Sequence, residues 1–115
     1  MQINEKNYEI TTSQYDYGVP VVFEAGEAQG FQIGDKIVFV FQNDVIEDRI
    51  YTVSTSDYSF NFALEKAEAD NLLATAVKNP VSVRYSVKRY VDDQFLETLV
   101  DSKLIVKNTL KWDGE

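Results

Sequence analysis

The feature that most constrains the fold is a strictly alternating segment, followed by a turn and a second strand-like segment. From Val81 to Val87 every second residue is apolar, and polar or charged residues stand between them. This two-residue period places the apolar side chains on one face of a β-strand. Asp92-Asp93 then predicts a turn, because aspartate is a preferred turn former, and Gln94–Val100 returns as the partner strand. The segment therefore predicts a β-hairpin.

Other short segments also carry the composition of β-strands. Pro20 cannot donate to a hydrogen-bond ladder, so its strand is expected at a sheet edge or to begin at the proline. The unbroken apolar run Ile37–Phe41 is typical of a central strand covered on both faces. Asp101-Ser102 predicts a turn before the last strand. All of these segments are rich in β-branched and aromatic residues, which favour strands. The predicted strands are Tyr8–Thr12, Val19–Phe23, Lys36–Phe41, Arg49–Ser54, Tyr58–Leu64 and Lys103–Lys107.

Two further segments differ from this pattern. Residues 24–32 carry Gly26 and Gly30, which predicts an exposed loop. Residues 65–74 contain helix formers with acidic residues early, where the helix dipole favours them, so a short helix is expected that ends before Pro80.

No repeat, low-complexity tract or linker divides the chain. We therefore expect one β-sandwich domain over residues 1–107 and a polar C-terminal tail over residues 108–115.

The composition excludes several classes of function. The chain has 115 residues, a formal net charge of −8, and neither His nor Cys. Without Cys there is no disulfide, zinc ribbon or thiol nucleophile, and without His there is no Ser-His-Asp triad or imidazole base. The excess of acidic residues disfavours nucleic-acid binding, which depends on Lys and Arg. No secretory signal and no apolar run long enough to span a bilayer is present, so we expect a soluble product made in the cytoplasm.

Carboxylate pairs remain as candidates for chemistry. Asp92-Asp93 lies between two well-patterned strands, so we interpret it as a turn; a calcium or acid–base pair is the alternative, which would need further oxygen ligands. Asp44, Glu47 and Asp48 lack the Asp-x-Asp-x-Asp-Gly order of a cation loop and are interpreted as a solvated loop. We therefore expect no catalytic residue, metal or cofactor, and the chain is not expected to be an enzyme.

Tyrosine is present in seven copies and combines a large apolar ring with a polar tip, which suits interfaces and carbohydrate-stacking surfaces. Strand propensity alone also explains this number. Tyr15 and Tyr17, beside the edge-strand Pro20, are the residues that we expect at an adhesive surface. A carbohydrate- or ligand-binding module that uses surface tyrosines, Tyr90 among them, is the alternative function. Trp112 in the tail either packs back on the domain or docks a neighbouring subunit.

Three segments in their order along the chain resemble a phage module. They are Gly34–Phe39, a turn feeding a strand; Tyr58–Ala69, a strand running into a short helix; and the closing hairpin of Val83–Tyr90 with Glu97–Val106. This order is similar to that of the immunoglobulin-like domain at the N-terminus of phage baseplate upper proteins and of related tail-fibre and neck-fibre proteins. The resemblance covers the chain from about Ile33 onward. It departs at Asn79-Pro80-Val81, where family members usually have Gly-x-Tyr.

The resemblance implies an all-β, immunoglobulin-like β-sandwich with one short helix, and it brings no catalytic residues. It also implies a structural role in a virion, in the tail, baseplate or fibre. We therefore expect a non-enzymatic assembly module that is made in the host cytoplasm and located in the virion. Its expected partners are other phage tail or baseplate subunits or copies of itself, with no nucleic acid, membrane or cofactor.

Overall fold

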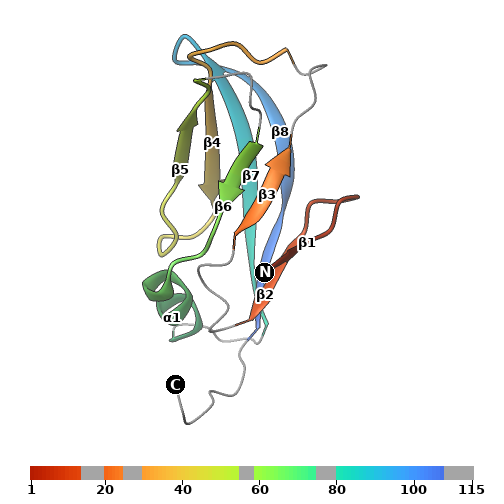
Figure 1. The fold of residues 1–115 in the computed structure, drawn as a ribbon. Helices are drawn as coiled ribbons and strands as arrows, with labels where there is room; N and C mark the ends of the chain where they lie inside the picture. Colours follow the sequence, from red (N-terminus) through yellow and green to blue (C-terminus); the bar gives the residue numbers. More distant parts are fainter. Residues whose placement is uncertain (14–19, 25–29, 55–58, 75–79, 108–115) are drawn as a thin grey trace.

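Figure 1 shows the fold as a computed structural model, which describes residues 1–13, 20–24, 30–54, 59–74 and 80–107. Within these residues the chain is mostly β-strand with one short helix, as the sequence predicts. No helix in this part of the chain is long and apolar enough to cross a membrane. The elements in order are β1 (Gln2–Ile3), β2 (Ile10–Ser13), β3 (Val21–Glu24), β4 (Lys36–Phe41), β5 (Arg49–Thr52), β6 (Ser59–Phe62), α1 (Lys66–Ala74), β7 (Val81–Val91) and β8 (Gln94–Lys107).

The described strands form two sheets. The large sheet has six strands in the order β1-β2-β8-β7-β4-β5, and the small sheet consists of β3 and β6. All neighbouring strands are antiparallel except β2 and β8, which run parallel. The large sheet is curled, and the small sheet lies across its inner side, with α1 at one end (Figure 1). The chain thus folds into two β-layers that bury a common core.

The predicted hairpin is confirmed as β7 and β8, which pair along their whole length. Asp92 and Asp93 at its tip have φ angles of 52° and 61°. Positive φ at both central residues is the geometry of a type I′ turn, whose twist matches that of the flanking strands. Aspartate tolerates this left-handed conformation better than most residues, which explains why two aspartates stand there.

The turn predicted at Asp101-Ser102 is wrong, because β8 continues through both residues. The Asp101 carboxylate accepts two hydrogen bonds from the Arg84 guanidinium, at 2.9 Å from Nε and 2.6 Å from Nη2. The Ser86 hydroxyl donates a third, at 3.4 Å. These contacts come from the neighbouring strand β7, so they offset the low strand propensity of aspartate.

Smaller differences from the predicted strands have local causes. The opening strand begins at Ile10, because Tyr8 has a φ angle of 59° and interrupts the extended chain. β4 is deeply covered on one face only, since Ile37, Phe39 and Phe41 are buried while Val38 and Val40 are half-buried. The loop expected to be exposed contains the buried Phe31. The strand β1 was not predicted.

Other expectations agree with the structure. β3 begins directly after Pro20 and pairs on one side only within the described residues, as expected for an edge strand. Gly34 has a φ angle of 97°, which confirms it as a turn glycine. In α1 the buried residues are Glu68, Ala69 and Leu72, which lie on one face of the helix.

Aromatic side chains join the two sheets. Phe23 of β3 packs edge-on against Phe39 of β4, with ring centroids 5.1 Å apart, and against Tyr85 of β7 at 6.3 Å. Phe62 of β6 packs on Phe41 at 5.1 Å and on Phe39 at 6.1 Å. Edge-to-face and offset contacts are the preferred geometries of aromatic pairs. The centre of the core is therefore an aromatic cluster contributed by both layers.

Candidate interaction surface

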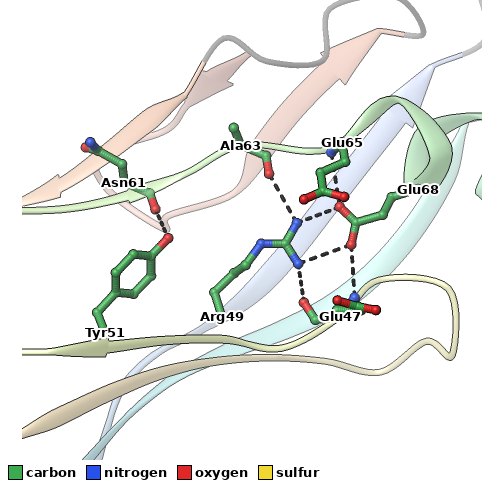
Figure 2. A network of polar contacts seen from close by, with 7 residues as sticks. All are labelled: Glu47, Arg49, Tyr51, Asn61, Ala63, Glu65 and Glu68. Carbon is green, nitrogen blue, oxygen red and sulfur yellow. Dashed lines mark hydrogen bonds and ion pairs between the residues drawn. The ribbon is translucent and has the colours of Figure 1, made fainter.

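Figure 2 shows a buried polar network that joins the two sheets and the helix. The Glu68 carboxylate of α1 accepts hydrogen bonds from Arg49 of β5 at 2.5 Å and 3.1 Å. It also accepts hydrogen bonds from the backbone N–H groups of Glu47 at 2.9 Å and Glu65 at 3.0 Å. Arg49 donates in addition to the carbonyl of Ala63, which follows β6, at 3.3 Å.

Hydrogen bonding keeps Glu68 ionised. Burial would raise the pKa of its carboxyl group, but the hydrogen bonds from Arg49 and from two backbone N–H groups outweigh this effect and lower the pKa. Each carboxylate oxygen already accepts two hydrogen bonds, so neither has an obvious lone pair for a substrate. The arrangement is that of a structural ion pair that ties α1 to both sheets.

A second arginine, which is buried, lies near the hairpin end of the core. Arg89 of β7 donates to the Asp35 carboxylate from Nε at 3.1 Å and from Nη2 at 2.8 Å. The same Nη2 donates to the carbonyl of Gly30 at 3.0 Å, and the guanidinium lies 4.7 Å from the centroid of the Phe31 ring. Glu97 of β8 is a more distant partner of Arg89 at 3.5 Å. Arg89 therefore fixes the segment before β4 against the large sheet.

Neither arginine cluster is predicted from the sequence. A signal for Arg89 does exist, because the two-residue period of buried positions in β7 extends one step beyond Val87 to Arg89. Glu68 and Asp35 carry no comparable signal, since their arginine partners lie 19 and 54 positions away in the chain. Within the described residues no buried side-chain nitrogen or oxygen lacks a partner.

Two of the acidic residues considered for chemistry from the sequence have structural contacts, which are Asp93 and Glu47. Asp93 forms an ion pair with Lys36 at 2.6 Å across the hairpin tip, and the hydrogen bond from this lysine lowers the pKa of Asp93. The loop with Asp44, Glu47 and Asp48 docks on α1 through the Glu47 N–H. In the part of the chain that the structure describes, no three potential ligands lie close enough to hold a metal ion.

Of the residues expected at an adhesive surface, Tyr15, Tyr17 and Trp112 lie outside the described residues, as do Gly26, Tyr58 and the tail 108–115. Tyr90 is described and is half-buried. Its ring packs edge-on against Phe95 of β8, with centroids 5.8 Å apart.

Two exposed apolar side chains, Ile50 and Phe95, lie on the side of the large sheet that points away from β3 and β6. We call this side the outer face. The strand register forms one row of Ile50, Val38 and Lys88, and a second row of Lys36, Tyr90 and Phe95. Ile50 is 64% exposed and Phe95 is 55% exposed. Between them along these rows lie half-buried Val38 and Tyr90 and the two lysines, a mixture of apolar and charged side chains that suits a protein-interaction surface.

The outer face concentrates positive charge on an acidic chain. Lys36 and Lys88 lie within it, and Arg84 and Lys103, a directly opposed pair on β7 and β8, continue it along the sheet. Lys88 also lies over the Phe95 ring, 5.7 Å from its centroid. The carboxylates beside these cations are Asp93 and Asp101, and hydrogen bonding to the cations lowers the pKa of both. Lys36 pairs with Asp93 and Arg84 with Asp101, so Lys88 and Lys103 account for the local excess of positive charge on β7 and β8.

Sequence comparison adds no relative. The chain matches no protein-family model, and a search of curated proteins finds no similar sequence.

Proposed function

We propose that this chain is a non-enzymatic assembly module of a phage virion, in a tail, baseplate or fibre. It contacts a neighbouring protein subunit through the outer face of the large sheet. The observation that carries the proposal is this face itself, where exposed Ile50 and Phe95 lie among lysines on a chain with a net charge of −8. Its partner is therefore a protein surface that is acidic and partly apolar.

The order of strands supports an immunoglobulin-like sandwich as the fold of this module. In such domains strands G, F and C, with C′ in the variable type, form one sheet, and strands B and E lie in the other. The neighbours β8-β7-β4-β5 and the pair β3-β6 correspond to G-F-C-C′ and B-E in chain order. The parallel pairing of β2 with β8 then adds the first part of the chain to the edge of strand G.

The packing between the sheets supports the same assignment. Antibody domains join strands B and F by a disulfide that packs on a tryptophan of strand C. This chain has no Cys, and the corresponding strands β3 and β7 meet instead through the rings of Phe23 and Tyr85. Phe39 of β4 packs on Phe23 where the tryptophan of strand C would be expected.

The two arginine clusters have structural contacts, which is compatible with the non-enzymatic role proposed here. Glu68 and Asp35 are the deeply buried carboxylates among the described residues, and each is held by an arginine. A general base needs an available lone pair in reach of a substrate proton. We therefore interpret Glu68 and Asp35 as residues that stabilise the fold through their ion pairs with arginine.

The proposal is tested by molar mass from light scattering over a concentration series, alone and with purified tail and baseplate subunits. We expect a defined complex that Lys88→Glu weakens, because this change reverses a charge in the middle of the outer face. Lys66→Glu, the same change at an exposed position on α1, is the matched control and should assemble normally. A chain that remains monomeric and binds none of these subunits would contradict the proposal.

A further inference from the structure

A cleft separates the open side of the small sheet from the large sheet, away from the outer face. Its volume is about 450 Å³. Its floor consists of apolar core side chains, which are Phe23, Phe31, Ile37, Phe60 and Val87. Tyr8 and Glu24 stand on the side of β3, and residues 97–100 of β8 form the other wall. The cleft therefore leads from the surface to the aromatic core between the two layers.

Two strand edges without a partner flank this cleft. β3 pairs with β6 on one side, and its other edge pairs with no strand in the described residues. β8 is covered by β2 only from Leu104 to Lys107, so its edge from Gln94 to Lys103 is likewise without a strand partner in this part of the chain. Such edges present N–H and C=O groups that can pair with another extended segment.

The β3 edge is the better template of the two. In β8 the register shifts twice, because Leu96 and Leu99 are extra residues relative to β7. Bulges of this kind bend a strand and disturb the spacing of its hydrogen-bonding groups. β3 pairs with β6 in continuous register from Val21 to Glu24, so its free edge keeps the regular spacing that a new strand requires.

The charge around the cleft restricts what can occupy it. Glu24 and Glu97 line it, and Glu97 is 43% exposed while facing Arg89 at 3.5 Å. A neighbouring hollow shares Tyr8, Phe23 and Glu24 with the cleft and adds Glu5. None of the described residues that line the two hollows is Lys or Arg. An occupant with basic residues is therefore favoured over an acidic one.

We propose that this cleft binds an extended segment of a partner protein as a third strand on β3. Alternate apolar side chains of the segment enter the cleft, and Lys or Arg side chains beside them face Glu24 and Glu5. Main-chain hydrogen bonds supply affinity in this mode, and the side-chain pockets supply selectivity. The four residues of β3 span about 13 Å, so roughly four or five residues of the partner pair with it.

The test uses the full chain labelled with ¹⁵N and a synthetic peptide in which Val and Thr alternate between two terminal Lys residues. We expect amide shifts at Val21–Glu24 and at residues 97–100, and about tenfold weaker binding to Glu24→Lys. Asp44→Lys is the matched control, since it makes a comparable charge change at an exposed loop position outside the cleft, and it should bind like the parent chain.

Peptide controls on the unmodified chain keep the test independent of any variant's folding. The same peptide with Glu at both ends should bind much more weakly, because its charges face Glu24 and Glu5. A peptide with Pro in place of its central residue should also bind weakly, because Pro lacks the N–H group that a strand donates and its ring does not fit a regular strand pairing. Equal binding of all peptides, or shifts confined to the outer face, would overturn the proposal. Self-association of the chain that is abolished by Glu24→Lys would also overturn the proposal, because the occupant of the cleft would then be a second copy of this chain. Lys88→Glu should leave peptide binding unchanged, which separates this proposal from the one above.

Discussion

Replacing Glu68 by Gln tests whether the network in Figure 2 holds the helix to the two sheets. The change keeps the shape of the side chain but converts one carboxylate oxygen into an NH₂ group. That atom can no longer accept the two hydrogen bonds at its position, one from Arg49 and one from a backbone N–H of Glu47 or Glu65. The guanidinium of Arg49 also loses its counter-charge.

The expected loss follows from these contacts. A buried donor left without an acceptor costs about 1–3 kcal/mol, and removing one partner of a fully buried ion pair costs about 3–5 kcal/mol. Arg49 keeps its bonds to the carbonyls of Glu47 and Ala63, and its side chain is 17% exposed, so water relieves part of the loss. We therefore expect the free energy of unfolding to fall by about 3 kcal/mol, equivalent to about 10–15 °C in melting temperature for a chain of this size.

Urea denaturation followed by circular dichroism measures this difference. Glu5→Gln is the matched control, because it makes the same chemical change on an exposed side chain away from the network, and it should alter the free energy of unfolding by less than about 0.5 kcal/mol. Equal stabilities of the two variants would refute the argument that the carboxylate of Glu68 anchors the helix.

The pH dependence of the same pair of proteins gives an independent test. Folding lowers the pKa of Glu68 below its value of about 4.3 in the unfolded chain. A group with a lowered folded pKa adds stability above the unfolded pKa, and this stability is lost as the pH falls through the folded pKa. The difference between the parent chain and Glu68→Gln should therefore be complete at neutral pH and shrink as the pH falls below about 4.

Two other substitutions address a turn and the core. Gly34→Ala should lower the free energy of unfolding by about 1–2 kcal/mol in the same urea assay, because its φ angle of 97° is unfavourable for a residue with a Cβ. The cost comes from the backbone alone, since no atom lies within 4 Å of the added Cβ, and an unchanged urea midpoint would contradict this. Tyr85→Phe removes the hydroxyl that donates to the carbonyl of Tyr8 and should cost about 1 kcal/mol. Burial raises the pKa of Tyr85, so the parent chain should lose stability as the pH rises above about 10, and the variant should lose less; equal alkaline losses would refute this.

The parts of the fold that could be predicted from the sequence depend on local geometry. The β7–β8 hairpin follows from the alternation after Val81 and from two aspartates that accept positive φ, and both signals lie within a few residues of the turn they specify. The helix α1 is likewise a run of helix formers, and its predicted start is one residue too early. Residues close together in the chain determine these two elements, so the local sequence is sufficient to predict them.

The parts that could not be predicted depend on partners far away in the chain. Asp101 looks like a turn residue until Arg84, 17 positions earlier, is placed beside it on the next strand. The parallel pairing of β2 with β8 joins the two ends of the domain, and nothing in the composition of Ile10–Ser13 indicates it. The outer face shares this property, since the register of four strands brings its two lysines and its exposed apolar side chains together.

The hydrogen bonds of Arg49 and Arg89 help to fix the narrow second layer and the adjoining chain on the wide sheet. The small sheet has two short strands, and the burial of apolar surface beneath it is by itself non-directional. The bonds from Arg49 to the Ala63 carbonyl and to Glu68 have defined geometry, and they fix the end of β6 and the start of α1 against β5. Arg89 fixes the chain before β4 in the same way through Gly30 and Asp35. Arg49 thus holds the end of the small sheet and Arg89 holds the segment before β4, in a chain that has no Cys to form a disulfide.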